Sequence, residues 1–352
     1  MIIVNLVTAN NVQLLGEQGL SGYEISGATV KQKLNEVPSA SLRFPATNLH
    51  ARNAIGMNRP AIEIIENDKR VFYGAAISTK VDIWGNTEIQ CDGALSFLSD
   101  IAKAPFTLNN KTHAEYIATI LDQYNAVVSD ERKVWFGGVV GFENDGNVDI
   151  DHSDEYTDML TLLKESVDKY GGYMFESYVD GTGSALHPYV GWVKEPTIDS
   201  GKVLEFGKNE LTLVNFFDFD EYASRVYATG QNGITFASEY VQDTDAEAAW
   251  GRRDYAYKTS APNAVVLATL ALAELVRRST PIRTVELTAL DLEQLGAPYS
   301  GFTLGTTATL LDQHFGINLT LMVNTVERDL LAPQNSKIAL GQSPIALTTS
   351  IR

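Results

Sequence analysis

The chain has 352 residues, a formal net charge of −17 and a single cysteine. This length predicts two or three domains with substantial cores, and the negative charge argues against stable binding to nucleic acid or to an anionic membrane surface. No apolar run approaches the roughly 20 residues of a membrane-spanning helix, and Met1–Leu6 lacks the basic leader and cleavage site of a signal peptide. The lone Cys91 fits synthesis in a reducing cytoplasm.

Residues 1–104 are predicted to form a first antiparallel β-barrel domain. Short runs of alternating apolar and polar residues, separated by Gly, Pro and Asn, are typical of strands in a closed or nearly closed barrel. A turn of helix is expected at Ala94–Asp100, where the chain leaves the barrel. The expected strands are Met1–Leu6, Val12–Leu15, Tyr23–Val30, Ser39–Phe44, Ala61–Glu66, Val71–Trp84 and Thr87–Cys91.

Residues 105–202 are predicted to form a small α+β domain that begins with a helix. Thr112 and Glu115 form a capping box, in which each side chain can bond the backbone N–H of the other residue. Apolar residues follow at helical spacing, which predicts a helix over residues 113–126. A hairpin of two strands, Tyr173–Tyr178 and His187–Trp192, is expected to end the domain.

A second helix of this domain is predicted to start near Ser153 or Asp154. Gly171 and Gly172 are expected to end it, because glycine adopts the left-handed conformation of a helix end at little cost. Its buried stripe is predicted to consist of Met159, Leu160, Leu163 and Val167.

Residues 203–230 and 281–352 are predicted to form a second β-barrel domain, interrupted by a helix-containing insertion at 231–280. The helix of the insertion is expected to use Ser260 as its N-cap, with Pro262 in the first turn. Pro281 is expected to end it. Its predicted buried face consists of Val266, Leu267, Leu270 and Ala273.

The second barrel is predicted to close with a meander whose layout repeats that of residues 61–93. The expected strands are Thr307–Asp312, Ile317–Arg328 and Lys337–Gly341. Period-two patterning of this length indicates strands with one buried face. Two such meanders in one chain indicate an internal duplication, which is a structural feature rather than a catalytic one.

Two stretches, Glu205-Phe-Gly-Lys-Asn209 and Tyr222-Ala-Ser-Arg-Val-Tyr-Ala-Thr-Gly230, resemble the signature of phage tail-tip and baseplate hub proteins. That group includes the prophage tail endopeptidase or tail-associated lysin N-terminal family. The resemblance continues through Tyr255, residues 286–296 and 302–305, and ends at Ile338–Gly341. It therefore covers at least residues 203–341, and the first 200 residues fit the expected domain order.

The resemblance implies a homotrimeric ring that caps the tail tube of a phage or phage-like particle, similar to the hub of contractile-tailed phages. Two similar barrels in each subunit would let a three-fold ring match a six-fold tube. The implied partners are the tail tube, distal tail or baseplate proteins and a central fibre or spike, with DNA or tape-measure protein only in transient passage. The implied location is the tail tip of the virion, after synthesis in the cytoplasm of a bacterial host, without stable membrane binding.

No catalytic, metal-binding or cofactor-binding residue is predicted, and the chain is not expected to be an enzyme. Asp149–Glu155 is rich in carboxylates but lacks the glycine and terminal glutamate of a calcium loop, so a solvated turn that caps the next helix is expected there. The Gly-x-Ser-x-Gly motif of a nucleophile elbow is absent. The histidines are scattered, without a His-Glu-x-x-His pair for zinc: His50, His113, His152, His187 and His314.

Other chemically suggestive residues also have a structural interpretation. Asp291 and Glu293 are expected to be solvated, Gly137-Gly138 and Gly181–Gly183 are expected to be turns, and Cys91 a small buried hydrophobe. The tryptophans are expected in the core or at interfaces rather than on a sugar platform: Trp84, Trp135, Trp192 and Trp250.

Two further functions stay open at this stage. One is a peptidoglycan-degrading tail enzyme, which only the family name favours. Lytic members of the family carry C-terminal extensions, and this sequence ends at Arg352, soon after Gly341, so a lytic part is not expected in it. The other is a carbohydrate-binding receptor module, which the tryptophans suggest. The negative charge fits either simple solubility or the wall of a channel that DNA passes without adhering.

Overall fold

A computed structural model describes residues 1–8, 11–53, 59–142, 148–152, 156–178, 187–195, 199–205, 210–289, 302–312 and 317–341. The chain divides into two compact units. Unit 1 consists mainly of Met1–Leu213 and Glu286–Leu340, and unit 2 mainly of Val214–Val285. Among the described residues, no helix combines the length and apolar character that crossing a membrane requires.

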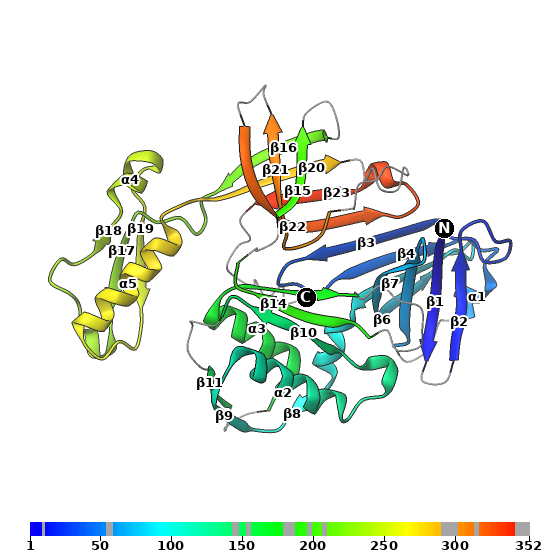
Figure 1. The fold of residues 1–352 in the computed structure, drawn as a ribbon, viewed down its shortest axis with the longest axis horizontal. Coiled ribbons are helices and arrows are strands. Elements are labelled where there is room, and N and C mark those ends of the chain that lie inside the picture. The colour runs from blue at the N-terminus through cyan, green and yellow to red at the C-terminus, as the bar shows by residue number, and fades with distance from the viewer. Residues whose placement is uncertain are drawn as a thin grey trace. The chain divides into compact units, whose positions relative to one another are not determined.

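Most of a thirteen-stranded sheet belongs to unit 1 (Figure 1). The strand order is β2-β1-β5-β6-β7-β4-β3-β22-β23-β20-β16, while β21 pairs with both β22 and β15. We call β1–β7 the first half, and β15, β16 and β20–β23 the second half. The strands are β1 Ile2–Thr8, β2 Asn11–Glu17, β3 Gly27–Lys33, β4 Ser39–Phe44, β5 Ala61–Glu66, β6 Lys69–Val81, β7 Thr87–Gly93, β15 Asp199–Glu205, β16 Glu210–Asp218, β20 Ile282–Ala289, β21 Thr307–Asp312, β22 Ile317–Asp329 and β23 Lys337–Gly341.

The predicted mixed fold, rich in strands with a few helices, is confirmed. The short helix α1 (Leu49–Asn53) follows β4, and the predicted helical turn after β7 is the 3-10 helix η1 (Ala94–Asp100). The strand pairings do not show two closed barrels, because β2 and β16 each end the strand order of the described residues.

Both predicted meanders are present, and their details correspond. In each, a strand of six residues pairs antiparallel with a strand of 13 residues, which pairs antiparallel with the next strand. Ala61 pairs with Ala75, and Thr307 pairs with Met322. In the pairing of the long strand with the next strand, both copies have a bulge two residues after these pairs, at Ile77 in β6 and at Asn324 in β22. The pairing of β5 with β6 has a further register shift, between Ile64 and Ile65, that β21 and β22 do not share. The shared bulge supports a duplication, since period-two patterning alone does not fix the position of a bulge.

The two halves are joined by antiparallel pairing of β22 with β3. The pairing runs from Thr325 opposite Lys33 to Asp329 opposite Thr29. Beyond its end, the backbone N–H of Leu330 donates to the carbonyl of Ala28 at 2.9 Å. The Leu330 side chain is 4% exposed and belongs to the core of the first half. A hydrophobic residue of the second half thus completes the core of the first half.

Residues 102–195 contain helices packed against short strands. The elements are β8 Ala102–Lys103, β9 Phe106–Lys111, α2 His113–Asn125, η2 Asp130–Arg132, β10 Trp135–Val140, β11 Val148–His152, β12 Thr157–Asp158, α3 Met159–Tyr170, β13 Tyr173–Ser177 and β14 Tyr189–Val193. The capping box of Thr112 and Glu115 is confirmed at the start of α2. The predicted hairpin of β13 and β14 is also confirmed, and β14 additionally pairs in parallel with β10.

The predicted start of the second helix near Ser153 or Asp154 is wrong. Asp158 is the N-cap of α3, and its side chain accepts from the backbone N–H of Thr161 at 2.9 Å. Helix formation is delayed because Thr157 and Asp158 pair with β8 in extended conformation. The later start also moves Leu162 into the buried face, whereas Leu160 is only partly buried. Gly171 ends the helix with φ +75°, as predicted.

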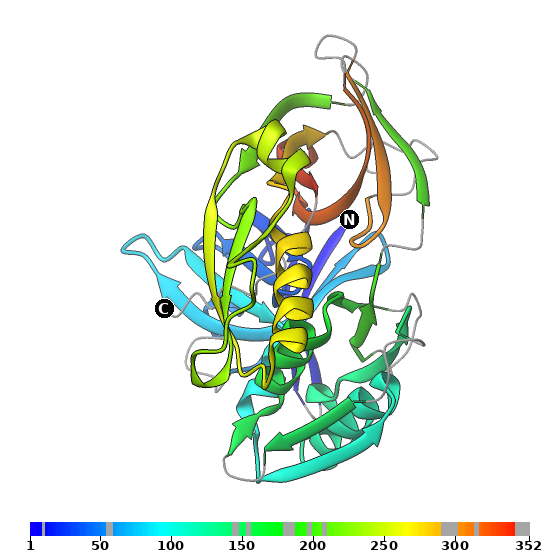
Figure 2. The same cartoon turned by 90° about the vertical axis from the view of Figure 1, so that its left-hand side faces the viewer.

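Unit 2 is a three-stranded sheet packed against α5, the helix that Figure 2 shows beside the strands. The parallel pair of β17 and β19 is extended by β18. Its elements are β17 Arg225–Thr229, η3 Gln231–Gly233, β18 Val241–Gln242, α4 Thr244–Trp250, β19 Asp254–Lys258 and α5 Ala264–Arg278.

The predicted N-cap of α5 at Ser260 is wrong. Asn263 caps the helix, and its side chain accepts from the backbone N–H groups of Val265 and Val266 at 3.1 and 3.0 Å. The predicted buried face is also rotated. The helix buries Leu267, Ala271 and Leu275 against the sheet, whereas the other three predicted positions, Val266, Leu270 and Ala273, are exposed.

Candidate functional site

The predicted candidate residues for chemistry that the structure describes do not come together. His50 stacks on Tyr23, with ring centroids 4.1 Å apart, and His187 lies against Trp135. His113 is buried among the rings of Phe142, Tyr170 and Trp192. His152 lies in β11, and His314 lies outside the described residues. Within the described ranges, no group of three or more His, Cys, Asp and Glu residues is arranged to hold a metal ion.

The acidic stretch Asp149–Glu155 is not a continuous turn as predicted. Residues 149–152 belong to β11, which pairs with β9, so the strand pairing removes this part of the stretch from the expected capping turn. Ser153–Glu155, the glycines at 181–183, Asp291 and Glu293 lie outside the described residues.

Cys91 and the remaining glycine pair have structural positions. Cys91 is buried in the core of the first half, and burial raises the pKa of its thiol. Gly137 and Gly138 lie within strand β10 rather than in the predicted turn. The close approach of the carbonyl of Val190 at Gly137 explains a glycine in a strand at this point.

The tryptophans divide into one core residue and three surface residues. Trp192 is fully buried and packs on Phe142, whose ring centroid is 4.4 Å away. Trp135 and Trp250 are 44% and 41% exposed, and Trp84 is 74% exposed. The core interpretation is therefore confirmed for Trp192.

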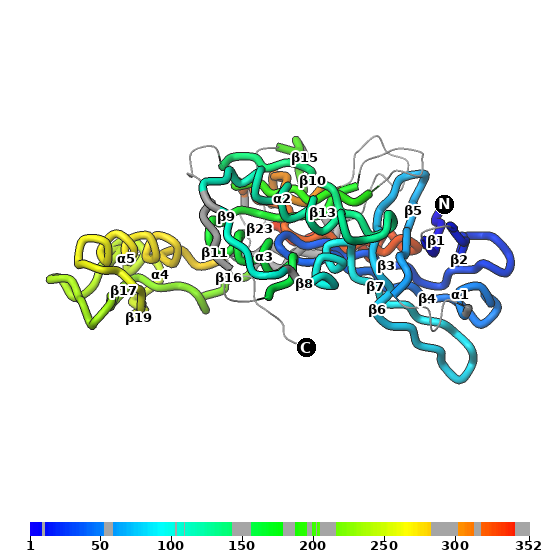
Figure 3. Tube along the Cα trace, turned by 90° about the horizontal axis from the view of Figure 1, so that it is seen from below, coloured from blue at the N-terminus to red at the C-terminus, as the bar shows by residue number. Residues whose placement is uncertain are grey.

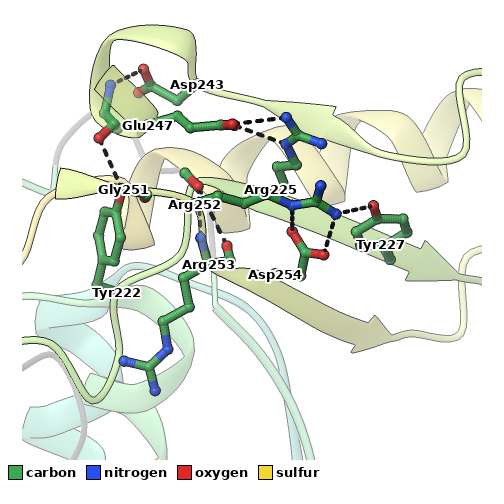
Figure 4. A network of polar contacts seen from close by, with 11 residues as sticks. Tyr222, Arg225, Tyr227, Asp243, Glu247, Gly251, Arg252, Arg253 and Asp254 are labelled. Atoms are coloured by element: carbon green, nitrogen blue, oxygen red, sulfur yellow. Dashed lines mark hydrogen bonds and ion pairs between the residues drawn. The ribbon is translucent and has the colours of Figure 1, made fainter. Parts of the chain in front are cut away.

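The signature stretch at 222–230 contributes to a polar network in unit 2 (Figure 4). Arg225 binds both carboxylate oxygens of Glu247 at 2.8 Å, which ties β17 to α4. The hydroxyl of Tyr222 donates to the carbonyl oxygen of Gly251 at 2.7 Å. Nearby, Arg252 binds both carboxylate oxygens of Asp254, at 2.9 and 2.7 Å. Two residues of the signature stretch, Tyr222 and Arg225, thus bind α4 and the residue that follows it, and these contacts stabilise the fold of unit 2.

Glu176, inside unit 1, is a carboxylic acid with a strongly altered proton affinity. The carboxyl of Glu176 is buried, and burial raises its pKa to about 7. The hydroxyl of Tyr178 donates to it, and so does the backbone N–H of Leu95, at 3.0 Å. A carboxyl of this kind is a candidate for catalysis where substrate can reach it. Glu176 instead joins β13 to η1 inside the protein. The inward position of Glu176 in the alternating run Tyr173–Tyr178 was the signal that could have identified it.

Among the described residues of unit 1, the hairpin of β6 and β7 carries the most exposed apolar side chains. Figure 3 shows its end projecting beyond the neighbouring strands. Four apolar residues along it have exposed side chains, and Ile83 and Trp84 at the end are the most exposed, at 89% and 74%. The others are Ile77 and Val81. Exposed apolar patches of this kind mark interaction surfaces, so this hairpin end is the candidate functional site.

The fold is that of phage tail proteins. The structure is similar to the 43 kDa tail protein of prophage MuSo2 from Shewanella oneidensis, with a TM-score of 0.64, 12% identity and coverage of 97% of this chain and 96% of that one. For the tail protein from Neisseria meningitidis MC58 the TM-score is 0.63, with 13% identity and coverage of 98% and 97%. For prophage tail protein gp18 from Listeria monocytogenes EGD-e the TM-score is 0.54, with 12% identity and coverage of 97% and 94%.

The sequence comparison agrees with the fold. Residues 198–349 match the family described as prophage endopeptidase tail, while no curated protein sequence matches the chain. The resemblance to phage tail proteins is thereby confirmed. At these identities the structural likeness defines the fold, and the activity has to be argued from the residues of this chain.

Proposed function

We propose that this protein is a structural hub of a phage or phage-like tail tip or baseplate. Three copies would form a ring that joins the tail tube to the tip and leaves a channel for DNA or tape-measure protein. The observation that carries this proposal is the duplicated meander, with a bulge at the same place in both copies and with β22 of the second copy paired to β3 of the first half. Two similar domains per chain would let three chains meet a tube with six-fold symmetry.

The two halves would act as two similar barrel domains in the assembled ring. Their strands in one chain end at β2 and β16, and contacts between copies would cover such edges, which otherwise invite unwanted pairing. The partners would be the tail tube, distal tail or baseplate proteins and a central fibre or spike. A net charge of −17 per chain would keep DNA from adhering to the channel during passage.

The proposed role is structural rather than enzymatic. The description of the matching family contains the word endopeptidase, which makes peptidoglycan hydrolysis the second candidate. The first candidate is supported by the structural roles of two charged groups that would otherwise suggest chemistry: Glu247 is held in an ion pair with Arg225, and the buried Glu176 accepts from the backbone N–H of Leu95. Zymography on cell walls separates the two candidates. If the protein clears the cell walls and replacement of a single acidic residue abolishes the clearing, the protein is a peptidoglycan hydrolase instead.

Sedimentation and electron microscopy of the purified protein test the hub. The expected species has three times the mass of the monomer and a projection with a central hole. Like-charged chains repel, so association is expected to strengthen when salt is raised from low to moderate concentration. A stable dimer would contradict the proposed ring.

A further inference from the structure

The two meanders end in equivalent tips. We call Asp82–Trp84 the first tip and Asp329–Leu331 the second tip. Each aspartate lies five residues after the bulge of its long strand, at Ile77 or at Asn324. Oδ1 of Asp82 accepts from the backbone N–H of Trp84 at 2.9 Å. Oδ1 of Asp329 accepts in the same way from the N–H of Leu331, at 3.1 Å.

Within the chain, the second tip is docked. Leu330 is 4% exposed in the core of the first half, and Leu331 packs against the same core. The strand that leads to this tip pairs with β3 over residues 325–329. The second tip therefore combines strand pairing with insertion of an apolar side chain.

The first tip has the same design but is not docked. Ile83 and Trp84 occupy the places of Leu330 and Leu331, and they are 89% and 74% exposed. Pairing of β6 with β5 stops at Ala75. Beyond that point β6 pairs only with β7 among the described strands, so the edge at residues 78–81 is open. In the second meander, the corresponding edge is the one that β3 covers.

The same correspondence identifies the surface that the first tip fits. In the first half, β3 is next to β4, and β4 is next to β7, the last strand of the meander. In the second half, β16 is next to β20, and β20 is next to β23, the last strand of the other meander. The counterpart of β3 is therefore β16, which ends the strand order.

We propose that the first tip binds a second copy of this chain by pairing the edge of β6 at residues 78–81 with β16 of that copy and placing Ile83 and Trp84 against its second half. In a single chain, six strands separate β6 from β16 in the sheet order, so the occupant is another copy. A contact between two different surfaces of identical chains repeats head to tail, and it forms a ring when the rotation from one copy to the next closes, as the proposed hub requires. The inference rests on the proposed hub, because it assigns the contact that would join the copies.

The first experiment compares the wild-type chain with the double variant Ile83→Ser, Trp84→Ser by sedimentation over a range of concentrations. Both side chains are exposed in the single chain, so the thermal unfolding midpoint of the monomer should stay unchanged. The dissociation constant of the assembly should rise at least tenfold. Val127→Ser is the matched control, because Val127 is also an exposed apolar residue, at 65%, and lies outside both tips.

Hydrogen exchange gives a second measurement that does not depend on a variant. On assembly, the backbone N–H groups of residues 78–84 and of β16 at residues 210–218 should both become protected. A ring that forms without protection at these two segments, or that the double variant forms as tightly as wild type, would overturn the inference and leave the proposed hub standing. A wild-type chain that stays monomeric at its highest soluble concentration would count against both.

Discussion

Replacing Glu176 with glutamine should change how the stability of the protein depends on pH. The pKa of this buried carboxyl is about 7 in the folded protein, against an ordinary value of 4.5. A raised pKa means that the folded state holds the proton more tightly than the unfolded chain does. The stability of the wild type should therefore be fully present below about pH 4.5 and should decrease as pH rises towards 7.

The size of this effect follows from the difference between the two pKa values. A tenfold change in proton affinity corresponds to about 1.4 kcal/mol, so ionising Glu176 in place should cost about 3 kcal/mol. Glu176→Gln keeps an oxygen for the N–H of Leu95 and carries no charge. Near pH 4.5 the variant and the wild type should have similar free energies of unfolding. Above pH 7 the free energy of unfolding of the variant should be higher than that of the wild type by about 3 kcal/mol.

Urea unfolding at several pH values between 4.5 and 8, followed by circular dichroism, measures this difference directly. Glu165→Gln is a suitable control, because Glu165 is an exposed carboxylate on α3 and its replacement should shift the curves little. A difference between Glu176→Gln and wild type that stays constant across this range would show that Glu176 is ionised at all these pH values, and it would refute the reasoning.

Three further substitutions test the packing described above. Leu330→Ala should lower the free energy of unfolding by about 2–5 kcal/mol, because it leaves a cavity in the core of the first half; an unchanged urea midpoint would show that the second tip is not docked in solution. Gly74→Ala should lower the yield of folded protein and its unfolding temperature, since the added Cβ would lie 2.0 Å from the carbonyl oxygen of Asp92. Gly27→Ala, with no neighbour closer than 3.4 Å, is its control and should fold normally. Asn263→Ala should cost about 1 kcal/mol by removing the cap of α5, and calorimetry that detects no loss would contradict that role.

The sequence patterns predicted the meanders and helix α2 because the pattern of each lies within one continuous stretch of sequence. The strands of both meanders alternate over many residues, and Thr112 and Glu115 form a reciprocal cap. The starts of α3 and α5 were mispredicted for a physical reason. Asp, Asn and Ser all cap helices well, and each region offers more than one of them. At α5 the choice between Ser260 and Asn263 depends on the preceding chain path rather than on the residue type.

The pairing of β3 with β22 could not be predicted in this way. It joins Thr29 to Asp329, and strand pairing across such a sequence separation has no local signature. Once that pairing is known, the apolar residues of the first tip can be interpreted as a docking surface. The sequence alone indicates only a turn at Gly85 and Asn86. The raised pKa of Glu176 likewise depends on burial by η1, a contact between distant segments.

Carrying β3 and β22 on one polypeptide has a kinetic consequence for any ring built from this chain. The contact between the halves forms during folding of each molecule, so its effective concentration is set by the connecting chain and not by the number of molecules in the cell. Only the remaining contacts, those between molecules, respond to dilution. In such a ring, the contacts within each chain would be formed before two chains meet. Subunits would exchange only by breaking the contacts between chains.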